Sequence, residues 1–554
     1  MNVLALRRSG SLNRNDWGAL GMAHDLADIL IIGAGASGAA VAWRLSDAGL
    51  RIVCLEQGRW HKPGEYSTSF PDWEFRGATS FSFNPNVRAL PEDYPVDDTG
   101  SDVTPLMFNA VGGSTVHWTA HAPRFHPSDF RVRSQDGVAD DWPLSYFDLE
   151  PYYDLNDQWM GCSGTAGDPA NPPRAPRPMP SLPLGPDGER LARGFDSLGW
   201  HWWPSDSYIN SVPYRGRAAC NNCGPNGLGC TVQAKASTDV TYWPAAIANG
   251  VELRTKARVF EVTTDATTGR ATGARYFDAD GNVQFQPARV VVVATNGIGT
   301  PRLLLLSKSE RHPNGLANSS GLLGRNLMFH PCAAITGFFS DGLDPTYRGP
   351  LGNILLSQEF YETDSARGFV RGYTFQMNRS TGPARTAMGF TMAPVAWGER
   401  HHADFAMRFG NSTTVIALGE DLPEEHNRVE LSESLTDSNG IAAPKVSYRL
   451  SENSARMMAH ACRQAETVLD AAGAHTVKAT VQLRPSGWHL MGTARMGDDP
   501  RRSVVDHSCR AHDVDNLYVV DGSVFVTGAS VNPTPTLQAI ALRAADHIRK
   551  AHNR

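Results

Sequence analysis

The sequence predicts an α/β protein in two parts: one domain with a parallel sheet, and a second domain with a mainly antiparallel sheet. The first part is indicated by the apolar run Ile29–Ile32, which leads directly into a glycine-rich turn, and by similar apolar runs much later in the chain. The second part is indicated by stretches of alternating apolar and polar residues, such as 368–377 and 413–418. Such alternation is typical of a strand in a sheet with one covered face.

The glycine-rich turn has the spacing of a dinucleotide-binding unit of the Rossmann type. Gly33 makes the tight turn, Gly35 lets the backbone approach a pyrophosphate, and Gly38 allows the following helix to pack closely on the strand. The helix N-terminus offers free N–H groups to phosphates. A second strand then ends at Glu56, which is suited to bind a ribose diol. The unit predicts binding of FAD or NAD. The contacts expected from it are Gly33, Gly35, Ala36, Ser37, Gly38 and Glu56.

Two later segments return to this nucleotide site. Residues 289–295 form a buried strand that ends at the glycine-containing turn 296–301, and a leucine-rich helix is expected from Arg302. Residues 516–521 form another short strand, and the final helix is expected over 537–548. Because ligands bind beyond the carboxyl ends of parallel strands, the nucleotide-binding domain is expected to be assembled from separated pieces of the chain.

The intervening segments suit a substrate-binding cap domain. Residues 121–216 are rich in proline and tryptophan, and residues 330–485 carry most of the alternating pattern. Residues 1–25 are mostly polar without a helix or strand period, and we expect a flexible extension there. The nucleotide-binding domain is then expected to comprise residues 26–120, 217–329 and 486–554.

Length, charge and composition restrict the class of protein. A chain of 554 residues is expected to form more than one domain. A net charge of -6 argues against nucleic-acid partners, and no apolar stretch is long enough for a membrane span. Arg7 and Arg8 resemble a twin-arginine signal, but no apolar segment or cleavage site follows them. We therefore expect a cytoplasmic protein without a membrane span.

Three of the eight cysteines lie close together in the sequence, at Cys220, Cys223 and Cys230. Their spacing in a glycine-rich loop suits an iron–sulfur cluster or another metal. The alternative is a loop with ordinary thiols, which we favour because no fourth ligand is evident. We therefore predict no metal site.

The C-terminal region carries the second informative pattern. Residues 489–497 read His-Leu-Met-Gly-Thr-Ala-Arg-Met-Gly, and Asn532 is followed by Pro-Thr-Pro-Thr. Together with the N-terminal dinucleotide unit, these residues resemble the glucose–methanol–choline (GMC) oxidoreductase family. With the run at 515–525, the pattern is similar to that of bacterial sugar and sugar-acid dehydrogenases and of pyranose oxidases. The resemblance covers about residues 27 to 550.

The resemblance implies FAD-dependent oxidation of an alcohol, with transfer of a hydride to flavin N5. An imidazole is a suitable base for the hydroxyl proton, and the resemblance assigns this role to His489. Asn532 would hold the hydroxyl oxygen. The helix that begins near Pro533 would stabilise negative charge on the reduced ring. The further cofactor contacts expected are Val259, Asn296, Asp521, Gly522, Asn532, Pro533 and Thr534.

A third site is predicted at residues 111–118, which read Val-Gly-Gly-Ser-Thr-Val-His-Trp. The loop Gly112, Gly113 and Ser114 lets the backbone run close under the isoalloxazine ring. His117 and the tryptophan after it resemble the His-Trp of pyranose oxidases, in which the histidine is bonded to the flavin 8α-methyl carbon. Two alternatives stay open: a covalent histidyl-FAD at His117, or a histidine that only packs beside the ring.

The predicted substrate is a carbohydrate or glycoside alcohol, with dioxygen or a carrier protein as electron acceptor. An aromatic or terpenoid alcohol is the alternative suggested by the tryptophans at 200, 202 and 203. An NAD-dependent reductase would use the same glycines but leaves His489 and Asn532 unexplained. A non-catalytic electron-transfer component would instead use the cysteine loop. Three other histidines near the cap borders could line the pocket, but surface or core placement is expected for them: His121, His126 and His330.

Overall fold

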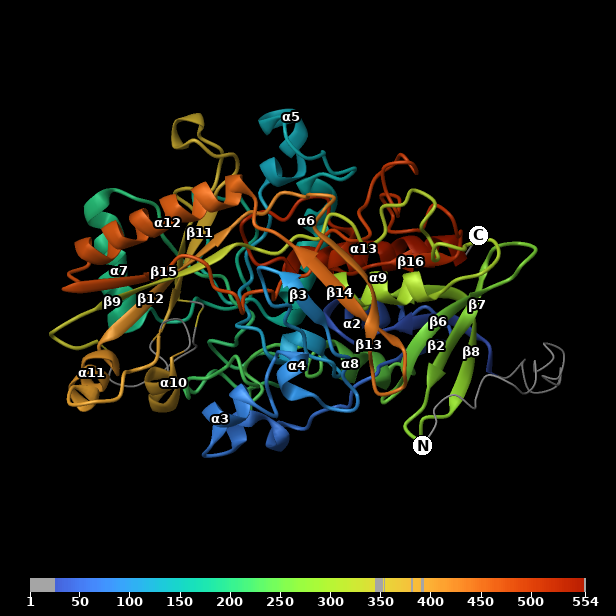
Figure 1. The fold of residues 1–554 in the computed structure, drawn as a ribbon, viewed down its shortest axis with the longest axis horizontal. Helices are drawn as coiled ribbons and strands as arrows, with labels where there is room; N and C mark the ends of the chain where they lie inside the picture. Colours follow the sequence, from blue (N-terminus) through green and yellow to red (C-terminus); the bar gives the residue numbers. More distant parts are fainter. Residues whose placement is uncertain (1–24, 344–351, 353, 380–381, 390–392, 553–554) are drawn as a thin grey trace.

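The protein has an α/β fold with two large sheets, in a computed structural model that describes residues 25–343, 352, 354–379, 382–389 and 393–552 (Figure 1). The larger sheet contains β1 Ala27–Ile32, β2 Ile52–Leu55, β5 Glu252–Arg254, β6 Arg258–Thr264, β7 Ala271–Phe277, β8 Val283–Val293 and β16 Leu517–Val519. Its order is β5-β2-β1-β8-β7-β6, and β16 pairs with β8. Strands β6, β7 and the first half of β8 form an antiparallel meander, and the other pairs are parallel.

The parallel strands of this sheet end in one row. Ile32 pairs with Leu55 on one side and with Val293 on the other, and Val293 pairs in turn with Val519. The residues that follow each strand therefore meet at a single edge of the sheet. That edge is where an α/β sheet binds its ligands, and it brings together segments from both ends of the chain.

The three glycines of the first turn meet different surroundings. A Cβ at Gly33, whose φ is +100°, would lie 2.5 Å from the Ala294 carbonyl oxygen. A Cβ at Gly38 would lie 2.0 Å from the Gly33 carbonyl oxygen, whereas one at Gly35 would meet only the Gly113 Cα, at 4.0 Å. Gly33 and Gly38 are therefore required for packing of strand, turn and helix, and Gly35 has an open face.

A layer of helices packs together beside the parallel strands. It contains α2 Ala36–Leu45, α6 Tyr146–Met160, α8 Tyr242–Ala248 and α13 Thr534–His552, and α13 contacts both α2 and α6. The Tyr153 hydroxyl lies 2.6 Å from the Thr536 hydroxyl, and Asn156 donates to Gln538 at 3.0 Å. These buried contacts tie α6 to the last helix of the chain.

Helix α9 differs from the expectation, because it spans Asn296–Leu306 rather than beginning at Arg302. The Asn296 side chain accepts hydrogen bonds from the backbone N–H groups of Ile298 and Gly299, which satisfies two donors of the first turn. Pro301 inside the helix has no N–H for the Gly297 carbonyl. That carbonyl accepts from the Thr493 hydroxyl instead, at 2.7 Å, so the helix tolerates the proline.

The second sheet confirms the predicted antiparallel part of the fold. It comprises β15 Thr476–Thr480, β9 Cys332–Phe338, β12 Ser412–Gly419, β11 Tyr373–Asn378, β10 Leu355–Ser357 and β4 Trp203–Pro204, in this order. All of its strand pairs are antiparallel. Helices α7 Gly185–Leu198 and α12 Glu452–Ala471 pack together beside it, on the left of Figure 1. This sheet and these two helices enclose a second hydrophobic core.

Smaller elements complete the chain. A third sheet contains β13 Arg428–Thr436, β14 Ala442–Tyr448 and β3 Asp97–Ser101. The short α-helices are α3 Trp73–Ala78, α4 Pro85–Arg88, α5 Val132–Asp136, α10 Pro383–Met388 and α11 His401–Arg408. The 3-10 turns are η1 Pro63–Glu65, η2 Ser67–Ser69, η3 Gly113–Val116, η4 Pro127–Phe130, η5 Ser365–Arg367 and η6 Gly522–Val524.

The domain borders given above stay a prediction, and all but Asp25 of the expected N-terminal extension lies outside the described residues. Across the described ranges, no helix combines the length and the apolar composition needed to cross a membrane. The cytoplasmic location also stays a prediction.

The packing of Gly38 gives a test of the nucleotide-binding unit. Replacing it with alanine forces a Cβ into the Gly33 carbonyl, and we expect G38A to lower the free energy of unfolding by about 1–3 kcal/mol, as overpacking does. Urea denaturation measures the change. The control is G64A, because a Cβ at Gly64 meets nothing within 4 Å. Equal stability of the two variants would contradict this account of the turn.

Candidate active site

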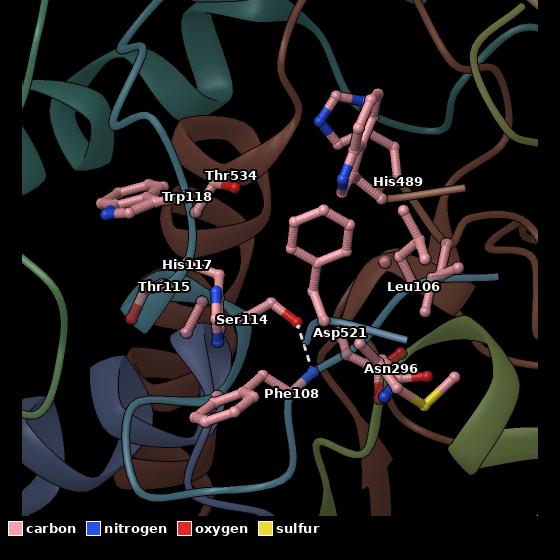
Figure 2. Close-up of a pocket in the computed structure, with 18 of the residues that line it drawn as sticks. Leu106, Phe108, Ser114, Thr115, His117, Trp118, Asn296, His489, Asp521 and Thr534 are labelled. Carbon is pink, nitrogen blue, oxygen red and sulfur yellow. Dashed lines mark hydrogen bonds between the residues drawn. The ribbon is translucent and has the colours of Figure 1, made fainter. Parts of the chain in front are cut away.

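One cavity extends from the edge of the parallel sheet to the face of the antiparallel sheet. Figure 2 shows His489 on one side of it and His117 with Ser114 on another. Of the predicted site residues, all line the cavity except Gly38 and Gly112. Gly38 is buried behind Gly33, and a Cβ at Gly112 would point at the Asp239 carboxylate, 2.9 Å away. The predicted residues that line it are Gly33, Gly35, Ala36, Ser37, Glu56, Gly113, Ser114, His117, Val259, Asn296, His489, Asp521, Gly522, Asn532, Pro533 and Thr534.

The carboxylate of Glu56 is fixed at the nucleotide end of the cavity. One oxygen accepts from the Ala34 N–H and the other from the Gly58 N–H, each at 2.8 Å. Burial raises the pKa of Glu56 to about 7, and these two backbone donors oppose the rise. The side chain therefore lies beside the glycine turn, where the sequence analysis expected a ribose contact.

Asp521 is fixed at the same edge, after the last parallel strand. Its carboxylate accepts from the Thr300 hydroxyl at 2.6 Å and from the Ser523 N–H at 2.9 Å. Burial raises the pKa of this carboxyl group. Through Thr300 the side chain links the strand end to α9, and so it holds two sides of the cavity together.

His117 presents one ring nitrogen without a partner. Its Nδ1 lies 3.1 Å from the Gly227 carbonyl oxygen, which only accepts, so Nδ1 carries the proton. Its Nε2 is buried and has no hydrogen-bond partner among the described residues. Burial lowers the pKa of His117 far below its ordinary value, so the ring is neutral and Nε2 has a free lone pair. The rings of Phe81 and Phe108 pack against it.

His489 is hydrogen bonded to a second histidine, His330. The two Nδ1 atoms lie 2.6 Å apart, and His330 Nε2 lies 3.2 Å from the Gly528 carbonyl oxygen and 2.9 Å from that of Ala529. Burial lowers the pKa of His330 to about 4, so it carries one proton at neutral pH. Because carbonyl oxygens only accept, that proton is on Nε2.

The tautomer of His489 follows from that of His330. With its proton on Nε2, His330 can only accept at Nδ1, so His489 Nδ1 must donate. Burial, with smaller effects of His330 and His121, lowers the pKa of His489 far below its ordinary value. The ring is therefore neutral, its single proton is on Nδ1, and Nε2 is left with a lone pair. His489 is thus prepared as a proton acceptor.

Asn532 is oriented in a similar way by Gln376 on β11. The Gln376 side-chain amide donates to the Asn532 Oδ1 at 2.6 Å. This bond occupies the oxygen of Asn532 and leaves its Nδ2 as a hydrogen-bond donor. The two predicted catalytic residues therefore line one cavity as a complementary pair, with His489 accepting and Asn532 donating. An alcohol hydroxyl, which donates one hydrogen bond and accepts others, matches this pair.

His330 and Gln376 are the site residues that sequence reasoning missed. His330 is 159 positions from His489, and Gln376 is 156 positions from Asn532. No local pattern connects partners so distant in the chain. His121 also lines the cavity, whereas His126 packs against Tyr361. The cavity is not lined by the tryptophans at 200, 202 and 203. Trp200 and Trp202 pack against the second hydrophobic core, between the antiparallel sheet and helices α7 and α12.

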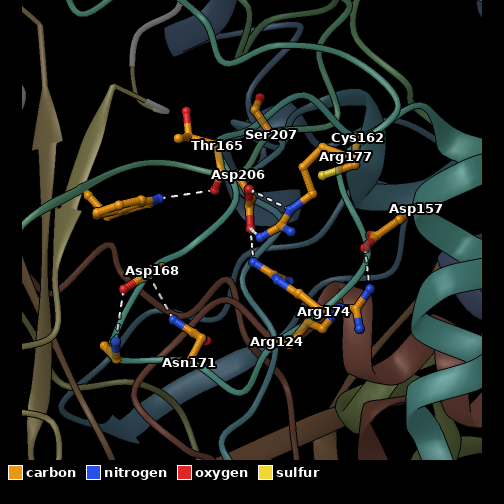
Figure 3. Close-up of polar contacts among 12 residues, drawn as sticks. Arg124, Asp157, Cys162, Thr165, Asp168, Asn171, Arg174, Arg177, Asp206 and Ser207 are labelled. Carbon is orange, nitrogen blue, oxygen red and sulfur yellow. Dashed lines mark hydrogen bonds and ion pairs between the residues drawn. The ribbon is translucent and has the colours of Figure 1, made fainter.

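A cluster of ion pairs lies apart from the cavity and connects segments before β4 to Asp206, which follows that strand (Figure 3). Arg174 and Arg177 both contact Asp206, the latter at 2.8 Å, and Arg124 contacts Asp157 at 2.5 Å. None of these side chains lines the cavity. Pairing offsets part of the desolvation cost of these buried charges, and the ion pairs hold the segments together.

The cysteine loop does not form a metal site among the residues that the structure describes. Cys220, Cys223 and Cys230 are free thiols, and no group of three side chains from His, Cys, Asp or Glu is arranged to hold an ion there or elsewhere in the described ranges. Burial raises the pKa of Cys220 and of Cys223. Gly227 in this loop supplies the carbonyl that binds His117.

Known proteins similar to this chain cover almost all of it. Models of the GMC oxidoreductase family match residues 186–332 and 423–541, and a model of the NAD(P)-binding Rossmann-like domain matches residues 31–93. The 2-methyl-1,2-propanediol dehydrogenase of Mycolicibacterium austroafricanum is 44% identical over 95% of this chain and 96% of its own length. The fructose dehydrogenase large subunit of Gluconobacter japonicus is 31% identical over 94% of this chain and 97% of its own length.

Solved structures agree at the level of the fold. Pyridoxine 4-oxidase from Mesorbium loti matches with a TM-score of 0.65 at 17% identity, over 95% of this chain and 99% of the other. Formate oxidase from Aspergillus oryzae matches with a TM-score of 0.64 at 15% identity, over 96% of this chain and 99% of the other. These matches and the close relatives confirm the resemblance inferred from the sequence motifs. The chain belongs to the GMC oxidoreductase family and is a flavoprotein oxidoreductase that acts on alcohol groups.

Proposed function

We propose that the protein oxidises an alcohol group of a carbohydrate or glycoside to a carbonyl, with FAD as the hydride acceptor. The observation that carries the proposal is that His489 and Asn532, which line the same cavity, have complementary hydrogen-bonding states. His489 Nε2 has a lone pair because His330 accepts from its Nδ1, and Asn532 offers an N–H because Gln376 occupies its oxygen. A hydroxyl held between the two donates to one residue and accepts from the other.

The residues at the other end of the cavity fit FAD. Gly35 has an open face toward the cavity, where a side chain would fill space needed by a pyrophosphate. Glu56 is fixed beside the same turn, and the N-terminus of α13 at Thr534 reaches the cavity from the opposite end of the chain. When bound, FAD supplies the acceptor for a hydride at flavin N5.

His489 takes the hydroxyl proton at Nε2 and becomes an imidazolium. The Nδ1–H then donates to His330, whose Nε2–H points at the carbonyl oxygens of Gly528 and Ala529. These carbonyl dipoles stabilise positive charge at the end of the chain of hydrogen bonds. Asn532 holds the oxygen, and so it fixes the direction of the C–H bond to be broken.

The side chains that the antiparallel sheet contributes to the cavity indicate which class of substrate fits. Gln376 and Asn378 lie on one face of β11 and line the cavity beside the apolar side chains of Ile416 and Leu418 on β12. Polar groups beside a hydroxyl-binding pair suit a substrate with further hydroxyls, and the similarity to fructose dehydrogenase supports this. The apolar side chains, with the 44% identity to a 2-methyl-1,2-propanediol dehydrogenase, favour a small branched diol as the second candidate.

We further propose that His117 Nε2 is bonded to the 8α carbon of the flavin. The support is that this nitrogen is buried and unpartnered among the described residues and belongs to a ring that lines the cavity, while Nδ1 is occupied by Gly227. A neutral ring with a free lone pair is a nucleophile, so Nε2 rather than Nδ1 is the expected point of attachment.

The first test follows the flavin spectrum under anaerobic conditions after addition of fructose, glucosides, aryl alcohols or 2-methyl-1,2-propanediol. We expect a sugar or glycoside to bleach the flavin. H489A should retain FAD and reduce it at least about 100-fold more slowly, since a positioned base contributes 10²- to 10⁴-fold. The control is H475A, because His475 is exposed and does not line the cavity.

Bleaching by the diol alone would replace the first candidate by the second. A flavin that none of these alcohols reduces would show that the substrate assignment is wrong. An H489A variant as fast as H475A would remove His489 from the role of base.

The pH dependence of flavin reduction tests the charge state of His489. The reaction needs the neutral ring, and burial lowers its pKa well below the ordinary 6.5. The rate constant for anaerobic reduction is therefore expected to stay level from alkaline pH down to 6.5 and to fall only below it. Stopped-flow absorbance at saturating substrate gives this profile. A midpoint at or above 6.5 would mean that His489 is not held neutral.

Acid precipitation tests the bond to His117. We expect the yellow colour to stay with the precipitated wild-type protein and to move to the supernatant with H117A. Digestion and mass spectrometry of the wild-type protein should locate the flavin on the peptide that contains His117. Colour released from the wild-type protein would exclude the covalent bond and leave the proposed alcohol oxidation standing.

A further inference from the structure

A lysine is completely buried beneath the loop that carries His117. Lys235 has no exposed surface, and its Nζ donates to three backbone carbonyl oxygens: those of Val116 at 2.8 Å, Trp118 at 3.0 Å and Asn226 at 2.5 Å. An ammonium group has three donors and no acceptor. The three carbonyls thus use the whole hydrogen-bonding capacity of the side chain.

This buried charge has no carboxylate in ion-pair contact in the part of the chain that the structure describes, and Asp239 stabilises it only from a longer distance. No carboxylate oxygen of the described residues lies within 4.0 Å of Lys235 Nζ, and burial lowers the pKa of Lys235 to about 8. Lysine is almost never fully buried without a charged partner. The hydrogen bonds to the three carbonyl oxygens therefore offset much of the cost of burying this charge.

The identity of the three carbonyls indicates what is needed. Val116 and Trp118 are the residues immediately before and after His117. Asn226 is the residue immediately before Gly227, whose carbonyl accepts from His117 Nδ1. One ammonium therefore binds both segments that determine the position of the ring: the loop that carries His117 and the loop that orients it.

We propose that Lys235 is the positioning residue that presents His117 Nε2 to the flavin for covalent attachment. This inference rests on the covalent bond proposed above. By holding residues 116, 118 and 226 together, the ammonium fixes the loop and its partner loop so that only Nε2 faces the cavity. The positive charge of Lys235, like that of Arg88, also disfavours protonation of His117. The nucleophile therefore stays neutral.

The attachment is balanced as follows. The N–C bond forms between His117 Nε2 and the 8α carbon, and one C–H bond of the 8α-methyl group breaks with loss of a proton to solvent. The electron pair of that bond remains on the ring system, which leaves the flavin reduced by two electrons. The alkylated His117 ring loses its Nδ1 proton, and dioxygen takes the two electrons with two protons and is reduced to hydrogen peroxide.

The experiment compares covalent and total FAD in K235M. Methionine keeps an unbranched apolar stem and removes the ammonium. We expect K235M to bind a full equivalent of FAD, because Gly35 and Glu56 bind it elsewhere. The rate of covalent attachment in air should fall about 10- to 100-fold, since small displacements of a reacting group cost this much. Acid precipitation at timed intervals measures the covalent fraction, and flavin absorbance before precipitation measures the total.

Two further variants separate positioning from general stability. L469A removes a fully buried side chain from the cap core and should lower the melting temperature while leaving the covalent fraction at the wild-type level. K235R keeps a cation with several donors and should recover part of the attachment rate. Recovery by arginine together with an unaffected L469A identifies loss of the cationic hydrogen-bond donor, rather than loss of stability, as the cause.

The outcomes distinguish this inference from the proposed function. A K235M protein that attaches FAD as fast as the wild type overturns the role of Lys235 and leaves the covalent bond standing. A wild-type protein that releases all its flavin in acid overturns both, and alcohol oxidation is still judged by bleaching. If K235M does not fold, K235Q carries the same prediction, and full-rate attachment in it is equally contradictory.

Discussion

The structure depends on the alignment of parallel strands that come from distant parts of the chain. Ile32, Leu55, Val293 and Val519 pair in one row, so the turn after each strand arrives at the same edge of the sheet. Gly33 can occupy that edge only because it has no side chain, since a Cβ there would meet the Ala294 carbonyl. This arrangement brings backbone N–H groups and carboxylates from both ends of the chain together at the nucleotide end of the cavity.

The proposed catalytic residues are organised by a different principle. Side chains with two possible hydrogen-bonding states are each held in one state by a distant partner. The carbonyls of Gly528 and Ala529 fix the proton of His330, His330 fixes that of His489, and Gln376 fixes the amide of Asn532. Preorganised groups of this kind accelerate a reaction because they need not reorient as charge develops. The polarity of the pair is therefore built into the fold before a substrate arrives.

Local patterns were sufficient to predict the parts of the molecule that are local in sequence. The segment from Gly33 to Glu56 belongs to one strand–helix–strand unit, and of its predicted contacts all but Gly38 line the cavity. The start of α9 was misplaced because its proline is tolerated through Thr493, which is far away in the chain. His330, Gln376 and Lys235 could not be recognised for the same reason: each acts through contacts more than 100 positions away, or through backbone carbonyls that carry no sequence signal.

The central claim is that His489 is a neutral base with its lone pair on Nε2. Neutron diffraction from crystals of the oxidised enzyme exchanged into heavy water at neutral pH would observe this directly. The account predicts a deuteron on His330 Nε2, a deuteron on His489 Nδ1 and none on His489 Nε2. A deuteron on His489 Nε2, alone or together with one on Nδ1, would contradict it, because the residue could then not accept the proton of an alcohol.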